Sequence, residues 1–271
     1  MASYKEDIIT SRQNPLIMRM AKLSDKKHRD NEGLFRVDGI KLYAEAVKSG
    51  VIMEYTFIAD SKRTRLTAEL ACELEAAGGD VFFVSDEVLS KLTDESAPQG
   101  IVGVAKKFRL DAPEIPGGGF RALYLSEIRD PGNLGTVIRT AYAFGVDRVF
   151  ISSDCADIYS PKVIRAAMGT VFRQSVAVVS DEAAFAKLMK AEKCPIYAAA
   201  LRREAKKLGS FVVPDRVCFA IGNEGHGLSD AFIDACESAV FIPMEEGCES
   251  LNAASAATTL IWEMQRDRFC R

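Results

Sequence analysis

The sequence predicts an α/β protein with two domains joined by a short linker. The linker is the stretch "LDAPEIPGGGF", where two prolines and three consecutive glycines make a poor helix or strand interior. Before it, short β-rich runs alternate with helical patterns. After it come six apolar runs separated by helical patterns, which is typical of a buried parallel sheet. We therefore predict domains at residues 1–109 and 120–271, with the linker at 110–119.

The first domain is predicted to be a small α/β sandwich. The apolar spacing of Leu16, Met20 and Leu23 indicates a helix over residues 14–30. Gly50 and Gly78 are typical residues at helix ends, and each closes a helical pattern. The predicted strands are 33–39, 53–60, 80–85 and 99–108, and the remaining helices are 40–50, 65–79 and 86–94.

The second domain is predicted to hold a parallel sheet covered by helices. Ligands of such sheets bind in the loops at the carboxyl ends of the strands. The six predicted strands are 122–128, 148–153, 174–179, 195–201, 216–222 and 239–244. The predicted helices are 135–145, 160–169, 181–193, 228–238 and 250–267.

Composition narrows the class of protein. With 48% hydrophobic and 27% charged residues, the 271-residue chain has an ordinary globular composition. Its net charge of −3 argues against recognition of nucleic acid by bulk positive charge, although local basic clusters exist. The seven cysteines are odd in number and lack CxxC spacing, which argues against a zinc site or a disulfide framework. No apolar run approaches membrane-spanning length, so we expect a soluble protein. The cysteine pattern favours a reducing compartment, so we expect a cytoplasmic protein without a metal.

Two loops of the second domain are rich in turn residues and are candidates for ligand binding. In "DPGNLGTVIRTAYAFG", a tight turn leads into a helix that carries Arg139; the arginine is either solvent-facing or part of an anion site. In "IGNEGHGLS", three glycines allow close approach to the backbone, and Glu224 lies among them. This spacing is neither a phosphate loop nor a dinucleotide fingerprint, which argues against a nucleotide-dependent oxidoreductase. We interpret His226 as a surface histidine rather than a catalytic base.

A third loop, "IPMEEGCESLNAASAATTLIWE", leads into the last helix. Ser250 and Asn252 stand where a helix cap is expected. The small residues 253–257 permit close approach of another helix or of the chain itself.

Together, the three loops resemble the SpoU/TrmH-type (SPOUT) RNA 2′-O-ribose methyltransferases, whose three motifs they match in order and spacing. The first domain is similar to that family's RNA-substrate-binding module, a ribosomal-protein-like sandwich, and "ESAPQGIVGVAKK" matches its end. The resemblance implies a deep trefoil knot in the second domain, a homodimer, and S-adenosylmethionine as cofactor. It implies cofactor contacts from Gly222, Ile242, Leu251, Leu201 and Met244.

The resemblance also implies the catalytic residues. In that family the corresponding arginine, here Arg139, is assigned to remove the proton of the 2′-hydroxyl together with the RNA phosphate. Because arginine is a poor proton acceptor, the alternative is that Arg139 holds the phosphate and stabilises charge on the 2′-oxygen. Asn133 and Glu224 are expected to orient Arg139 or the ribose, and Ser250 and Asn252 to complete the pocket.

The implied function is methylation of a ribose in RNA, with large-subunit ribosomal RNA as the expected substrate. Candidates for RNA contact are Lys22, Arg29 and Arg36. Two alternatives stay open: a transfer RNA 2′-O-methyltransferase, and a non-catalytic RNA-binding or ribosome-assembly protein on the same fold.

Overall fold

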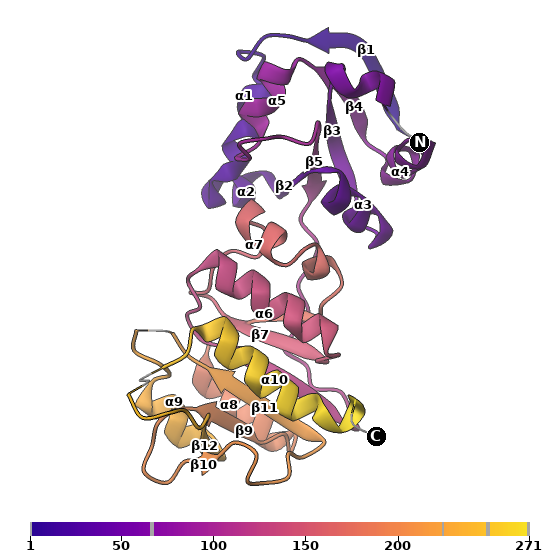
Figure 1. Cartoon of the computed structure of the whole chain (residues 1–271). Coiled ribbons are helices and arrows are strands. Elements are labelled where there is room, and N and C mark those ends of the chain that lie inside the picture. The colour runs from indigo at the N-terminus through magenta and orange to yellow at the C-terminus, as the bar shows by residue number, and fades with distance from the viewer. Residues whose placement is uncertain (1, 66–67, 224, 248–249, 270–271) are drawn as a thin grey trace. The chain divides into compact units, whose positions relative to one another are not determined.

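The computed structural model describes residues 2–65, 68–223, 225–247 and 250–269 (Figure 1). The chain folds into two compact units. The first comprises Met1–Arg109 together with Asp157–Phe172, and the second comprises Leu110–Ala156 together with Arg173–Arg271. The segment Asp157–Phe172 thus packs with the first unit, although it lies beyond the predicted linker at 110–119.

The first unit is built on a five-stranded sheet with the order β1-β4-β3-β5-β2. Strands β1, β4 and β3 run parallel, and β5 runs antiparallel to both β3 and β2. The strands are β1 (Ser3–Ile9), β2 (Leu34–Asp38), β3 (Met53–Ala59), β4 (Asp80–Val84) and β5 (Ile101–Lys106). The helices of this unit are α1 (Pro15–Ala21), α2 (Lys26–Glu32), α3 (Ile40–Lys48), α4 (Ala68–Ala77), α5 (Asp86–Leu92) and α7 (Pro161–Ala166).

Two details of the first unit differ from the prediction. Strand β1 was not predicted; it lies at the edge of the sheet, where exposed, charged positions such as Lys5 hide the apolar signal. The single helix predicted over 14–30 is divided into α1, a short 3₁₀ turn (Lys22–Ser24) and α2. The division falls at Asp25, whose backbone is extended and whose carboxylate accepts a hydrogen bond of 2.7 Å from the amide of Lys27.

The second unit contains the predicted parallel sheet, with seven strands in the order β10-β12-β9-β11-β6-β7-β8. All six predicted strands are present, and the two-residue β10 is additional. The strands are β6 (Phe120–Leu125), β7 (Arg148–Ser152), β8 (Val176–Val179), β9 (Ile196–Ala199), β10 (Lys206–Lys207), β11 (Arg216–Ile221) and β12 (Ser238–Phe241).

The order of the strands fixes where a ligand site is expected. The chain leaves β6 towards β7 and β8 at one edge, then crosses to the other side of β6 for β9 and β11. The direction of winding therefore reverses between β6 and β11, and ligands of open α/β sheets bind at such a switch point. Buried apolar side chains on these strands, including Tyr124, Phe150 and Ala220, form the core beneath it.

The helices of the second unit are α6 (Pro131–Ala143), α8 (Glu182–Ala191), α9 (Asp230–Ala235) and α10 (Ala253–Phe269), and α10 packs against α6 (Figure 1). Helix α6 begins four residues before the predicted start at 135, because Asp130 caps it and Pro131 suits its first position. Helix α10 begins at Ala253 rather than at residue 250. Across the described ranges, no helix combines the length and the apolar character needed to cross a bilayer.

Candidate active site

A cavity lies at the carboxyl ends of three neighbouring strands of the second unit. Strands β9, β11 and β12 end at Ala199, Ile221 and Phe241, and each is followed by a loop that contributes to the wall. The first turn of α10 closes the cavity with the small side chains Ala253 and Ala256. The cavity has a volume of about 460 Å³, within the range of small-molecule sites.

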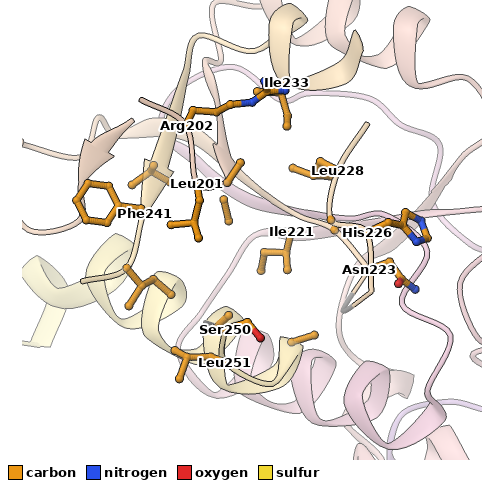
Figure 2. A pocket seen from close by; sticks show the side chains of 18 of the residues that line it. Leu201, Arg202, Ile221, Asn223, His226, Leu228, Ile233, Phe241, Ser250 and Leu251 are labelled. Carbon is orange, nitrogen blue, oxygen red and sulfur yellow. The ribbon is translucent and has the colours of Figure 1, made fainter. Parts of the chain in front are cut away.

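Most of the side chains that line the cavity are apolar, and polar side chains and main chain of the loops complete the wall (Figure 2). Ile221, Leu228 and Phe241 form part of the apolar wall, while Asn223 and His226 lie along one side. Leu201 is 72% exposed and Leu251 is 37% exposed, so both present apolar surface to an incoming ligand. All five residues predicted to contact the cofactor line this cavity: Leu201, Gly222, Ile242, Met244 and Leu251.

The glycine loop that follows β11 folds back upon itself. A Cβ atom on Gly222 would lie 2.2 Å from the carbonyl carbon of Gly227 and 2.3 Å from the amide nitrogen of Leu228. Gly227 has a φ of +70°, which glycine adopts without steric cost. The chain itself therefore makes the close approach at Gly222, where the start and the end of the glycine loop come into contact.

Asn223 ties this loop to the loop that follows β6. Its side-chain amide donates to the carbonyl oxygen of Glu127 at 2.9 Å, and its side-chain oxygen accepts from the amide of Gly225 at 2.8 Å. Its backbone oxygen accepts from the amide of Gly227 at 2.9 Å. The glycine loop is thus fastened to the neighbouring strand end at the switch point.

Asn133 and Asn252 are brought together from α6 and α10. Asn252 Oδ1 accepts from the amide of Ala254 at 2.9 Å, which caps α10, and its Nδ2 donates to Asn133 Oδ1 at 3.1 Å. The two amides link the beginnings of the two helices. Ser250, two residues before Asn252, lines the cavity, whereas Asn133 and Asn252 do not.

Arg139 lies further along α6 and is exposed. Within the described part of the chain, its guanidinium takes part in no ion pair and no hydrogen bond, so it is accessible to an external anion. Glu224, the remaining residue predicted to be catalytic, lies outside the described residues.

The rim of the cavity carries a polar cluster around Glu127 that the sequence analysis missed. Glu127 adopts a φ of 54°, which is uncommon for a residue other than glycine, and Ser152 Oγ accepts from its amide at 2.9 Å. Its carboxylate lies 2.6 Å from a guanidinium nitrogen of Arg129 and 3.6 Å from Nε2 of His226. The His226 side chain is 60% exposed, in agreement with its interpretation as a surface histidine, although it also lines the cavity.

Buried polar groups support the sheet below the loops. The hydroxyl groups of Tyr124 and Ser126 donate to the same carboxylate oxygen of Glu182, at 2.5 and 2.8 Å. Burial, followed by the bond to Glu182, raises the pKa of Tyr124, so this hydroxyl stays protonated as a donor. Burial also raises the pKa of the Cys155 thiol, which argues against a nucleophilic cysteine there. In the ranges described above, no group of three or more His, Cys, Asp or Glu side chains is placed to hold a metal ion.

The residues predicted to contact RNA lie in the first unit and differ in accessibility. Lys22 is exposed. Arg29 is 3% exposed and bonds to Asp157 Oδ2 at 2.7 and 2.9 Å, and Arg36 is 1% exposed and pairs with Asp94 at 2.7 Å. These contacts favour a structural role for both arginines over a phosphate contact, which needs an accessible guanidinium.

Comparison with known families supports the family resemblance predicted for each of the two domains. Residues 121–262 match the SpoU rRNA Methylase family. Residues 14–103 match the MRM3-like substrate binding domain.

Similar proteins match over nearly the whole chain. The 23S rRNA (guanosine(2553)-2′-O)-methyltransferase RlmP of Bacillus subtilis is 30% identical, over 95% of this chain and 98% of its own. The 23S rRNA (uridine(2479)-2′-O)-methyltransferase of Streptomyces viridochromogenes is 28% identical, over 96% and 92%.

Among solved structures, the AdoMet-bound rRNA methyltransferase from Sinorhizobium meliloti is 28% identical, covers 98% of both chains and superimposes with a TM-score of 0.86. The SpoU match spans more than half of the chain, and two of the three motif loops, the glycine loop and the loop before α10, line the cavity described above. This protein belongs to the SpoU rRNA methylase family.

Proposed function

We propose that this protein transfers the methyl group of S-adenosylmethionine to the 2′-hydroxyl of a ribose in large-subunit ribosomal RNA. The C–S and O–H bonds break, a C–O bond forms, and S-adenosylhomocysteine and a proton, which passes to solvent, are released. The observation that carries this proposal is the cavity at the ends of β9, β11 and β12, because the glycine loop and the loop before α10 meet there. Family membership and the AdoMet-bound relative give this cavity its chemistry.

The residues of the cavity fit such a cofactor. Its volume of about 460 Å³ suits a nucleoside-sized ligand, and its apolar wall suits an adenine ring. Gly222, Ile242 and Leu251 would make the main contacts, with Leu201 and Met244 completing them. When bound, S-adenosylmethionine supplies a methyl group that its sulfonium has already activated.

Arg139 is the group proposed to act on the RNA. A guanidinium stays protonated in proteins and binds phosphate with a planar, two-pronged geometry. We therefore assign Arg139 to hold the phosphate beside the target ribose and to stabilise negative charge developing on the 2′-oxygen, rather than to remove its proton. Its exposure on α6 leaves it accessible for both tasks.

Asn133 and Asn252 would act as positioning residues. Their hydrogen bond joins α6, which carries Arg139, to the start of α10, which borders the cavity. This bond would hold the phosphate-binding residue in register with the cofactor. Ser250 would contribute to the pocket wall, and Glu224 keeps its predicted orienting role as part of the proposal.

Ribosomal RNA is favoured as the substrate by both domain matches. The MRM3-like substrate binding domain accompanies the catalytic domain in this chain, and the two relatives of similar identity are named for 23S rRNA. Those relatives are named for a guanosine and a uridine, so the target base is left unassigned. Lys22 is retained as a candidate RNA contact, and a ribosomal substrate supports a cytoplasmic location.

Two further features belong to the proposal. A homodimer is supported by aromatic side chains on α10, because Trp262 is 41% exposed and Phe269 is 55% exposed. A trefoil knot in the second unit is supported by family membership and by the tight return of the glycine loop at Gly222. Neither a transfer RNA substrate nor a non-catalytic role has a comparable observation in its favour.

The proposal is tested by mapping ribose methylation in RNA from cells that lack this protein. We expect one 2′-O-methyl mark to disappear from large-subunit ribosomal RNA and to return with the wild-type gene but not with Arg139→Ala. Loss of a mark from transfer RNA, with ribosomal RNA unchanged, would overturn the choice of substrate.

A further inference from the structure

One side of the cavity carries a pair of opposite charges. Among the described residues that line the cavity, only Arg202 and Asp230 are acidic or strongly basic. Arg202 lies in the loop after β9 and Asp230 is the first residue of α9, and their side chains form an ion pair. Figure 2 shows Arg202 beside Ile233, on the opposite side of the cavity from Ser250 and Leu251.

The pair is accessible to a ligand. The Arg202 side chain is 39% exposed and the Asp230 side chain is 86% exposed. Exposed ion pairs contribute little to stability, so separating the two groups costs little. A ligand that carries both an anion and a cation would satisfy each group while leaving no charge unpaired in the cavity.

The proposed cofactor has one part with this charge pattern. Its amino-acid end bears a carboxylate and an ammonium group, whereas adenine and ribose carry no full charge. The other described residues that line the cavity have no carboxylate, guanidinium or ammonium group. The charged end of the ligand therefore has one matching position among these residues.

We infer that Arg202 and Asp230 bind the amino-acid end of S-adenosylmethionine. The guanidinium of Arg202 takes the carboxylate, and the carboxylate of Asp230 takes the ammonium group. The ion pair between the two residues is exchanged for two ion pairs with the ligand. This inference rests on the proposed function and adds to it the two residues that select a cofactor with an amino-acid end.

The test compares two ligands that share adenosine and a neutral thioether and differ in the amino-acid end, which S-adenosylhomocysteine has and 5′-methylthioadenosine lacks. Titration calorimetry would measure the Kd of each for the whole protein. We expect Arg202→Ala and Asp230→Asn each to weaken S-adenosylhomocysteine by about fivefold while leaving 5′-methylthioadenosine unchanged. Retained binding of 5′-methylthioadenosine also shows that the variant cavity is folded.

Two matched controls are available. Arg203→Ala removes the neighbouring exposed arginine, and Asp234→Asn removes an exposed carboxylate from the same helix; neither residue lines the cavity. Both should bind the two ligands as the wild type does. Unchanged affinity for S-adenosylhomocysteine in Arg202→Ala, or equal weakening of both ligands, would overturn the inference while leaving the proposed function intact. A wild-type protein that binds neither ligand would overturn the proposed function as well.

Discussion

At the scale of single residues, Arg139 is the residue proposed to bind the RNA phosphate and to stabilise charge during methyl transfer. It is accessible on α6 and lies outside the cavity wall, so its removal should affect the RNA and not the cofactor. We expect Arg139→Ala to lower the single-turnover rate of methyl transfer by about 10²-fold or more, since removal of one charge-stabilising donor has effects of this size. The affinity for S-adenosylmethionine should stay nearly unchanged.

The control for this variant is Lys187→Ala, which removes an exposed positive charge from α8. It should keep wild-type transfer. Arg139→Lys retains the charge without the planar fork and should recover part of the rate. If Arg139→Ala turned over like the wild type, the assignment of this residue would be wrong.

Gly222 is a position in the glycine loop where the surrounding backbone leaves no room for a side chain. A methyl group there would meet backbone atoms of Gly227 and Leu228 at 2.2–2.5 Å, and backbone cannot move aside as a flexible side chain does. We expect Gly222→Ala to displace the glycine loop, to destabilise the protein by about 1–3 kcal/mol and to weaken cofactor binding strongly. Thermal unfolding and calorimetry would measure the two effects.

The comparison for Gly222→Ala is Gly225→Ala in the same loop. A Cβ on Gly225 would meet only Asn223 Oδ1 among the described neighbours within 4 Å, at 3.3 Å. We therefore expect a much smaller change in both measurements. Equal effects of the two substitutions would contradict the view that the return of the chain at Gly222 determines the loop.

At the scale of elements, the start of α10 combines a cap with a link between helices. Asn252 caps α10 through Oδ1 and contacts Asn133 through Nδ2. Asn252→Ala should remove both and lower stability by about 1 kcal/mol. Asn252→Ser should restore the cap, because serine is an equally good capping residue, but its shorter side chain should not restore the link.

The two variants therefore separate stability from positioning. We expect denaturant unfolding to distinguish Asn252→Ala from Asn252→Ser, and methyl transfer to fall in both. Wild-type transfer by Asn252→Ser would show that the cap, and not the bond to Asn133, is the contribution of this residue.

The elements that could be predicted are those whose hydrophobic pattern reflects burial in the core. The six strands of the second unit are continuous apolar runs and were found, whereas the exposed edge strand β1 and the two-residue β10 carry no such signal. The predicted start of α6 at residue 135 is too late, because Asp130 and Pro131 are typical both of turns and of helix starts, and here they begin the helix.

Some residues of the candidate site could likewise be predicted from the sequence, and others could not. The resemblance was sufficient to name cofactor-contact residues, and Leu201, Gly222, Ile242, Met244 and Leu251 do line one cavity. The pair of Arg202 and Asp230 could not be found, because the two residues are 28 positions apart and only the fold brings them together. Arg29 and Arg36 were named as RNA contacts, but both are buried and paired with a carboxylate. The sequence alone does not show whether a basic side chain will be exposed or held in an ion pair.

At the scale of the whole molecule, an exposed aromatic group on α10 is the strongest support for the proposed dimer. The ring of Phe144 contacts those of Trp262 and Phe269 edge to face, each with centroids 5.8 Å apart. Large aromatic side chains that stay exposed on a helix face are enriched at the centres of protein interfaces. A second copy of this chain would cover them.

We therefore expect Trp262→Glu to shift the protein from dimer to monomer in light scattering, because a charge placed in the middle of an apolar interface is left without a partner. Val212→Glu is the control, since Val212 is 87% exposed in a loop of the same unit and should leave the assembly unchanged. A wild-type protein that is monomeric at micromolar concentration, or a Trp262→Glu variant that remains dimeric, would place the interface elsewhere or remove it. Methyl transfer by the dissociated variant would be a second measurement. If transfer is lost while cofactor binding persists, the RNA site requires both copies of the chain.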